Sequence, residues 1–401
     1  MNRAGPSDHP LAMLGGQPAF SKALPVGQLY FPNWQEYTDS FKQIFARQYY
    51  TNHGPLLQEL EQRLAAYFDV RHAICVTNAT IGLIMAMECL NLKGKVIVPS
   101  FTFVATAQAL TWANLEPVFC DVDVETHHIT PAIIEPLIDP QVSAILAVNL
   151  WGGCCDAEAL QPLADKHGLK LIFDSAHAFG CRVNNRPVGG FGAVEVFSFH
   201  ATKVFSSAEG GCLTTNDDEL AKRLRNVRSS YGAGPAVSVV KTSNGRMSEA
   251  QAAIALLNLD MFDDILRRNR RLTEIYHARL AAIPGVVLVE PRNTSRSNHQ
   301  YVVVELNEDA FGLSRDALLR VLRAENIVAR RYFYPGVHRT PPYIHENPQY
   351  LGCLPNTDRL NRDVLQLPIG ALVTDDDAIK VCGIIRMAHK KSRELKAVLG
   401  A

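Results

Sequence analysis

Residues 171–216 have the sequence LIFDSAHAFGCRVNNRPVGGFGAVEVFSFHATKVFSSAEGGCLTTN. The stretch opens within a mostly apolar run, Leu169 to Phe173, which predicts a strand buried on both faces of a sheet. Asp174 is the first polar residue after that run, at the position where open α/β sheets hold ligand-binding groups. A second short strand is expected from Val194 to Phe199, and Lys203 follows it in a loop. We therefore expect a carboxylate and an amine at the ends of neighbouring strands.

Two explanations of this Asp and Lys pair are open. A salt bridge is the simpler one. The alternative begins from the residues Ala201-Thr202 and Val204-Phe205, which would desolvate the lysine amine and lower its pKa. A neutral amine is the nucleophile that Schiff-base chemistry requires. In enzymes that use pyridoxal phosphate (PLP), a carboxylate keeps the pyridine nitrogen of the cofactor protonated. Asp174 and Lys203 could fill these two roles.

The motifs along the chain resemble those of one family, the sugar aminotransferases of the DegT group. The similar segments are TNHGP, PSFTFVATAQAL, FCDVD, EVFSFHATK, EGG and NGRMSEA, and they extend over nearly the whole chain. Members are fold-type I PLP enzymes that aminate nucleotide-linked keto-sugars, and the segments are most similar to the subgroup acting on dTDP-4-keto-6-deoxyglucose. The resemblance implies a PLP-dependent transaminase whose cofactor is covalently bound to Lys203, with glutamate as amino donor and dTDP-4-amino-4,6-dideoxyglucose as product.

Other functions were weighed against this one. A 3-aminotransferase acting on a related 3-keto sugar nucleotide and a non-catalytic PLP-binding regulator remain alternatives. Sugar dehydratases of the family carry His in place of the lysine, so Lys203 excludes them. A dinucleotide-binding enzyme is disfavoured because no GxGxxG follows a strand.

Composition limits the partners. The chain has 401 residues with 40 basic and 40 acidic side chains, and this balance predicts no binding to nucleic acid or to an anionic membrane. Nine cysteines without a CxxC pair indicate reduced thiols in a cytoplasmic protein. No apolar run is long enough to span a bilayer. His127 and His128 lack a third ligand, so we expect them to face solvent and expect no metal site.

Apolar runs alternate with helical patterns through the first two thirds of the chain. This alternation predicts an α/β fold in which a large, mostly parallel sheet has helices on both faces. Fewer long apolar runs follow, and we expect a smaller α+β domain there, with strands from Tyr301 to Leu306 and from Ile327 to Tyr334. The expected division is residues 1–262 for the large PLP-binding domain and 263–401 for the small C-terminal domain.

The segment His72 to Thr80 predicts a strand, a small polar turn and the start of a helix. Free backbone N–H groups at such a helix start favour a phosphate, but Thr80 could equally be a helix cap. The resemblance implies the phosphate role. It assigns catalysis to Lys203 and Asp174, and it implies that these two contact the cofactor together with Thr80, Ile81, Phe103, His177 and Ser198.

The segment NGRMSEA implies a homodimer with shared active sites. In relatives the corresponding Asn reaches the PLP phosphate of the neighbouring subunit, and Asn244 and Arg246 match that motif. A loop rich in Arg, Tyr and His, ARRYFYPGVHRTPPY, resembles the segment that faces the substrate. The candidate substrate-binding residues are His200, Arg246, Arg331, Tyr332, Tyr334 and His338.

Overall fold

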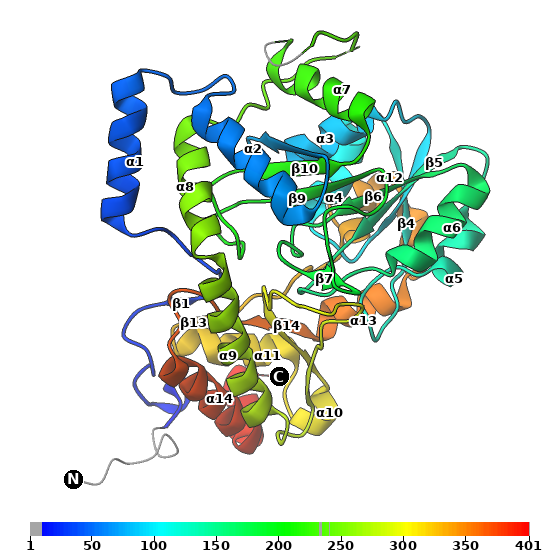
Figure 1. The fold of residues 1–401 in the computed structure, drawn as a ribbon. Coiled ribbons are helices and arrows are strands. Elements are labelled where there is room, and N and C mark those ends of the chain that lie inside the picture. The colour runs from blue at the N-terminus through cyan, green and yellow to red at the C-terminus, as the bar shows by residue number, and fades with distance from the viewer. Residues whose placement is uncertain (1–9, 232–234, 240, 401) are drawn as a thin grey trace.

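A computed structural model describes residues 10–231, 235–239 and 241–400. Its centre is a seven-stranded sheet in the order β2-β10-β9-β6-β5-β3-β4 (Figure 1). Only β10 runs antiparallel to its neighbours. The strands are β2 (His72–Val76), β3 (Lys95–Pro99), β4 (Glu116–Cys120), β5 (Val142–Val148), β6 (Lys170–Asp174), β9 (Val194–Ser198) and β10 (Gly211–Thr215). The α/β class and the mostly parallel sheet are confirmed.

Helices cover both faces of this sheet because its strands are apolar on both sides. One face packs against α3, α4 and α7, and the other against α2, α8, α5 and α6. The helix bounds are α1 (Trp34–Arg47), α2 (Pro55–Phe68), α3 (Ala79–Cys89), α4 (Val104–Trp112), α5 (Pro131–Ile134), α6 (Ala157–His167), α7 (Asp218–Ser229), α8 (Glu249–Asp260), α9 (Phe262–Leu280), α10 (Glu308–Phe311), α11 (Arg315–Ala324), α12 (Tyr343–Glu346), α13 (Pro355–Asp363), α14 (Asp375–Lys390) and α15 (Ser392–Leu399).

A second, antiparallel sheet lies in the C-terminal part of the chain. It consists of β11 (Val286–Leu288), β12 (Val302–Leu306) and β14 (Val364–Leu367), and α9, α11 and α14 pack around it (Figure 1). Two further pairs are β7 (Arg182–Val183) with β8 (Arg186–Pro187), and β1 (Leu24–Pro25) with β13 (Ile327–Val328). Short 3₁₀ helices are η1 (Ala12–Leu14), η2 (Glu135–Leu137), η3 (Val337–Arg339) and η4 (Pro348–Tyr350).

The first described residues belong with this C-terminal part. β1 pairs in parallel with β13, and Leu11, Phe20 and Leu24 are buried in the apolar cluster of the C-terminal sheet. Residues 10–25 therefore pack on the far end of the chain, whereas the expected division assigned them to the large domain. We accordingly propose a small domain that comprises residues 263–401 and this N-terminal segment.

The expectation that His127 and His128 face solvent is wrong. Both rings are buried, and His127 Nε2 lies 3.0 Å from Glu305 Oε1 while Trp151 Nε1 donates to His127 Nδ1 at 3.1 Å. The backbone N–H of Leu150 donates to His128 Nε2. Both histidines therefore satisfy polar groups inside the fold, and the described residues contain no cluster of three metal-ligating side chains.

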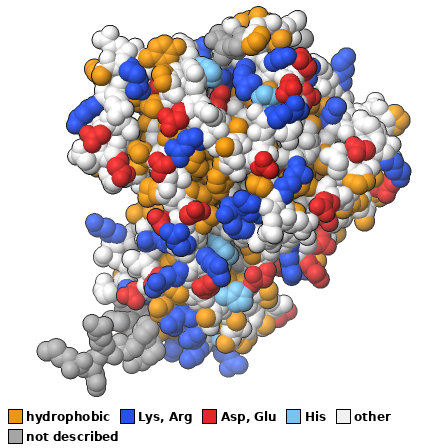
Figure 2. Space-filling model, viewed as in Figure 1, with side chains coloured by type: hydrophobic (Ala, Val, Ile, Leu, Met, Phe, Trp, Pro, Cys, Tyr) orange, Lys and Arg blue, Asp and Glu red, His pale blue; other side chains and the backbone are white. Residues whose placement is uncertain are grey.

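The surface agrees with the balanced composition. Acidic and basic side chains are interspersed over the face shown in Figure 2. Among the helices that the structure describes, none combines the length and apolar character needed to cross a bilayer.

Candidate active site

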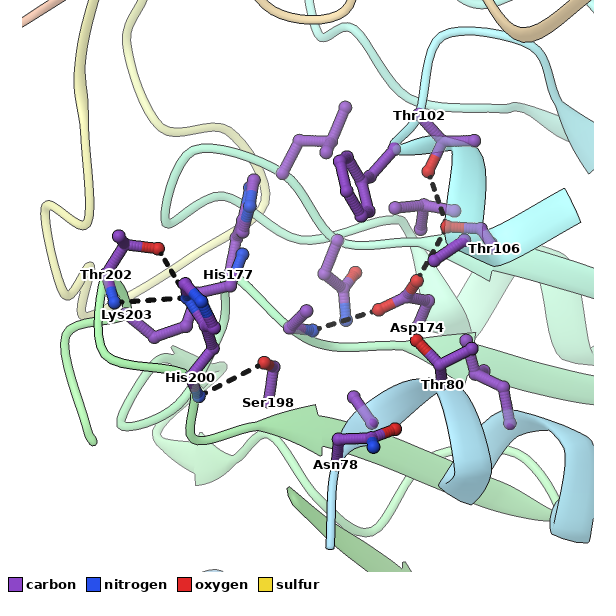
Figure 3. Close-up of a pocket in the computed structure, with 18 of the residues that line it drawn as sticks. Asn78, Thr80, Thr102, Thr106, Asp174, His177, Ser198, His200, Thr202 and Lys203 are labelled. Carbon is purple, nitrogen blue, oxygen red and sulfur yellow. Dashed lines mark hydrogen bonds between the residues drawn. The ribbon is translucent and has the colours of Figure 1, made fainter. Parts of the chain in front are cut away.

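A cavity of about 750 Å³ opens at the carboxyl ends of β6 and β9. The N-termini of α3 and α4 and the loop after β13 complete its wall. Figure 3 shows polar side chains from these separate elements around one space. Its polar side chains include Asn78, Thr80, Thr102, Thr106, Asn149, Asp174, His177, Ser198, His200, Lys203, Glu209 and Arg330.

Asp174 is the last residue of β6 and is buried. Its Oδ2 accepts a hydrogen bond from Thr106 Oγ1 at 2.8 Å, and Thr106 is in turn 2.9 Å from Thr102 Oγ1 (Figure 3). Its Oδ1 accepts from the backbone N–H of Ala176 at 3.1 Å. Burial raises the pKa of Asp174, while Thr106, Ala176 and the charge of Lys203 lower it. The carboxylate is thus fixed in position and hydrogen-bonded on both oxygens.

Lys203 lines the same cavity. Burial lowers the pKa of its amine to about 8, an effect that Asp174 opposes and Arg330 reinforces. No ion pair of Lys203 with a carboxylate is present among the described residues, so the simple salt-bridge explanation does not account for this pair. A substantial fraction of this amine is neutral near pH 8, the form that reacts with a carbonyl.

The start of α3 forms one end of the cavity. Asn78 is its N-cap, and Asn78 Oδ1 accepts from the backbone N–H of Ile81 at 2.9 Å. Thr80 is therefore not the cap, and its hydroxyl side chain lines the cavity instead. The amide of Ile81, expected to face a phosphate, is engaged by Asn78 in this structure. The helix still directs the positive end of its dipole at the cavity.

His177 and Phe103 face the cavity from two different elements. His177 is buried, and its Nδ1 has no hydrogen-bond partner in the part of the chain that the structure describes. Burial holds the pKa of His177 well below its usual value, so the ring is neutral. Phe103 leaves 52% of its surface exposed, which is unusual for a phenylalanine and leaves a flat apolar face free.

Ser198 and His200 follow one another along the chain at the end of β9. Ser198 Oγ accepts from the backbone N–H of His200 at 3.4 Å. The His200 ring lies 2.9 Å from Thr202 Oγ1 and 3.6 Å from Glu209 Oε1. Both Ser198 and His200 line the cavity.

Four of the six expected substrate-binding residues lie outside the cavity lining, namely His338, Arg331, Tyr334 and Arg246. His338 is fully buried, with Nδ1 2.6 Å from Ser100 Oγ and Nε2 3.2 Å from Asp358. Arg331 pairs with Asp316 at 3.1 Å, and its guanidinium covers the ring of Tyr334. His338 and Arg331 thus contact other parts of the protein and Tyr334 is 49% exposed, whereas Tyr332 does line the cavity.

Asn244 and Arg246 also lie outside the lining of this cavity. Asn244 is exposed and Arg246 is half-buried. Their loop packs on the start of α3, because Thr77 donates from its backbone N–H to the Gly245 carbonyl at 2.8 Å. This arrangement leaves the Asn244 side chain facing outward.

The cavity also contains residues that the sequence motifs did not single out, among them Thr102, Thr106, Tyr301 and Arg330. Thr106 lies in the first turn of α4, whereas Thr102 precedes the N-cap residue Phe103, so helical spacing alone does not bring the two threonines together. The adjacent Arg331, and not Arg330, was expected to contact the substrate.

Comparison with known proteins assigns the chain to a family. The model of the DegT/DnrJ/EryC1/StrS aminotransferase family matches residues 34–386. The chain belongs to this family. The resemblance inferred from the sequence motifs is thereby confirmed.

Individual members of the DegT/DnrJ/EryC1/StrS family are similar over most of their length. The dTDP-4-amino-4,6-dideoxy-D-glucose transaminase of Shigella dysenteriae is 36% identical over 88% of this chain and 98% of its own. That of Escherichia coli is 31% identical over 91% of this chain and 98% of its own. A crystal structure of DesI in the presence of its TDP-sugar product superposes with a TM-score of 0.92 at 41% identity, covering 98% of this chain and 99% of that one.

As a member of this family the protein is a PLP-dependent sugar aminotransferase whose cofactor is attached to a lysine. The cavity fits that cofactor. It offers an amine of lowered pKa, a buried carboxylate, an unpartnered imidazole nitrogen and a helix N-terminus. PLP carries the complementary groups, which are an aldehyde, a ring nitrogen, a phenolic oxygen and a phosphate.

Proposed function

We propose that this protein transfers the amino group of glutamate to C4 of dTDP-4-keto-6-deoxy-D-glucose, giving dTDP-4-amino-4,6-dideoxy-D-glucose. The observation that carries the proposal is the convergence of Lys203 and Asp174 on one cavity in a member of this aminotransferase family. The substrate is proposed because two relatives similar over their full length are transaminases named for this amino sugar.

We assign the cofactor contacts as follows. Lys203 forms the covalent attachment, and Asp174 faces the ring nitrogen. Thr80, Ser198 and the start of α3 hold the phosphate, with the Ile81 amide available if Asn78 turns away. Phe103 would provide a flat surface against the cofactor ring. His177 would form a hydrogen bond with the phenolic oxygen of the ring.

Bound in this way, PLP supplies an electron sink for the carbon from which a proton is removed. The protein residues do the rest. The ionised carboxylate of Asp174 keeps a proton on the ring nitrogen, because a charge-assisted hydrogen bond favours the protonated form. The amine of Lys203, once released, moves a proton to or from the reacting carbon as general acid and base. Phe103 and Tyr332 exclude water from the reacting atoms.

We further propose that the active unit is a homodimer with shared sites, in which Asn244 reaches the phosphate in the partner's cavity. The outward exposure of Asn244 supports this placement. So does α1, which presents Trp34 at 76% and Phe45 at 64% exposure, more apolar surface than an isolated helix face usually leaves in water. A cytoplasmic location is proposed from the nine unpaired cysteines.

One assay tests the proposed reaction. Purified holoenzyme is incubated with glutamate and dTDP-4-keto-6-deoxy-D-glucose, 2-oxoglutarate is quantified, and the position of the new amine is read by NMR. Formation of the 4-amino sugar supports the proposal. Amination at C3, or a preference for a GDP-linked 4-keto sugar, would contradict it.

The control is a pair of lysine variants. Lys203→Ala should abolish turnover, since it removes both the attachment and the proton carrier. Lys222→Ala removes an exposed lysine on α7 that pairs with Glu219, and it should leave turnover unchanged. Turnover of Lys203→Ala at the wild-type rate would refute the assigned role.

A further inference from the structure

We propose that Arg330 binds the α-carboxylate of the amino donor. This inference rests on the proposed function, because it concerns the first substrate of the same cavity. It adds to the site a cation that was not among the candidate substrate-binding residues.

Arg330 is held at the cavity by its backbone. Its N–H donates to the Gln366 carbonyl at 3.2 Å, and its own carbonyl accepts from Gln366 N–H at 2.7 Å. Gln366 is a buried residue of β14. The side chain extends from this anchored point into the cavity, where Nη1 lies 3.3 Å from the hydroxyl of Tyr332. Because the backbone makes the anchoring contacts, a change of side chain leaves them intact.

The charge of Arg330 is not balanced by a carboxylate. It forms no ion pair with any residue that the structure describes. The cavity lining holds two acidic residues, and both are engaged elsewhere: Asp174 accepts from Thr106 and Ala176, and Glu209 lies beside His200. A half-buried guanidinium facing a ligand cavity without a counter-ion is suited to an anionic ligand.

The position of the Arg330 guanidinium relative to Lys203 indicates which anionic group of the substrates it would bind. Arg330 is near enough to Lys203 for its charge to lower the pKa of that amine. In an α-amino acid the carboxylate is bonded to the same carbon as the reacting amine, so its oxygens lie beside the reacting nitrogen. In a nucleotide-linked 4-keto sugar the diphosphate is on C1, across the ring from the reacting C4. A cation beside Lys203 is therefore suited to bind the α-carboxylate of the amino donor. The planar guanidinium of arginine can donate hydrogen bonds to both carboxylate oxygens.

The test separates the two half-reactions of the holoenzyme. In the first, glutamate is added alone and conversion of the cofactor is followed by absorbance in single turnovers. Arg330→Gln should raise the half-saturating glutamate concentration about 10- to 100-fold, as expected for loss of a hydrogen-bonded charge pair. Arg330→Lys should retain part of the affinity. The control Arg323→Gln, an exposed arginine on α11, should match the wild type.

A matched pair of donors sharpens the result. 4-Aminobutyrate is glutamate without its α-carboxylate. The wild type should favour glutamate strongly, and Arg330→Gln should reduce that preference while leaving the rate with 4-aminobutyrate unchanged. Equal preference in wild type and variant would overturn the proposal.

An equilibrium measurement gives a readout that does not depend on turnover. Glutarate carries two carboxylates and no amine, and calorimetry should show weaker glutarate binding to Arg330→Gln than to Arg323→Gln. Removal of the cation should also move the pH dependence of covalent PLP uptake by the apoenzyme to higher pH, because Arg330 lowers the pKa of Lys203. A merely structural role would produce neither change.

The second half-reaction tests whether Arg330 instead binds the diphosphate of the sugar nucleotide. Amino-loaded enzyme is mixed with dTDP-4-keto-6-deoxy-D-glucose, and its half-saturating concentration should be unchanged by Arg330→Gln. A defect confined to this arm would assign Arg330 to the diphosphate and overturn the proposal. If the wild type fails to aminate this sugar but reacts with glutamate, the proposed acceptor is wrong, and the glutamate arm still decides the role of Arg330.

Discussion

At the scale of single residues, the protonation state of Asp174 depends on two threonine hydroxyl groups at the start of α4. Thr102 contacts Thr106, Thr106 contacts Asp174, and all three residues are buried. The hydrogen bond from Thr106 partly offsets the rise in pKa that burial imposes on the Asp174 carboxyl group. In the proposed cofactor arrangement, electron withdrawal by PLP would therefore depend on two neutral side chains as well as on the carboxylate itself.

We expect Thr106→Val to move the acid limb of the activity profile to higher pH by about one to two units. The valine keeps the volume and removes the donor that lowers the pKa of Asp174, so the carboxylate becomes protonated at a higher pH as the solution is acidified. The measurement is kcat against pH on the fully loaded enzyme. Thr102 is one hydrogen bond further from the Asp174 carboxylate, so Thr102→Val should cause a smaller shift of the acid limb. A uniform loss of kcat with an unmoved acid limb would show that Thr106 only fills space.

Asp174 and Lys203 could be proposed from the sequence, but the roles of neighbouring side chains could not be distinguished there. Asp174 and Lys203 were indicated because each follows an apolar strand. Arg330 and Arg331 are adjacent, and only the fold decides which one faces the cavity and which one pairs with Asp316. His338 was misplaced for the same reason, since its burial against Ser100 depends on residues far away in the chain.

At the scale of secondary-structure elements, the first strand residue of β10 touches the start of α3. A Cβ atom on Gly211 would lie 2.8 Å from the Ala79 nitrogen and 2.8 Å from the Phe197 carbonyl oxygen. Glycine is therefore required for the helix N-terminus to approach the sheet at the phosphate end of the cavity.

Gly211→Ala should lower the free energy of unfolding by about 1–3 kcal/mol, the usual effect of overpacking. It should also weaken PLP binding, because the helix start must shift. Urea unfolding and PLP titration measure the two effects. The control is Gly383→Ala within α14, where the new methyl group meets nothing within 4 Å and should be neutral or stabilising. Equal behaviour of the two variants would contradict the argument.

Elements with strong local signals were predictable. The capping boxes at Ser248 and Thr374 mark the starts of α8 and α14. The run from Ile327 to Tyr334 was expected to be one strand, but β13 ends at Val328. Its short length follows from its partner, β1, which offers only two residues for pairing. Such long-range pairing leaves no trace in the local pattern.

At the scale of the whole molecule, the proposed dimer with shared sites makes a prediction that a monomeric site does not. Lys203→Ala and Asn244→Asp should each be inactive as separate preparations. When their subunits are mixed and exchanged, mixed dimers contain one site with both changes and one with neither, so about a quarter of the wild-type activity should return. If Asn244 acted within its own subunit, every site would stay defective and the mixture would remain inactive.

The pairing of β1 with β13 has a consequence for the order of events during synthesis. The ribosome releases Leu24 early, yet its partner Ile327 emerges only after most of the chain has been made. Until then we expect the apolar side chains of Leu11, Phe20 and Leu24 to stay exposed to water, while the large sheet can assemble without them. We therefore expect the C-terminal layer to close late in folding, after the segment around Leu24 has met its distant partner strand.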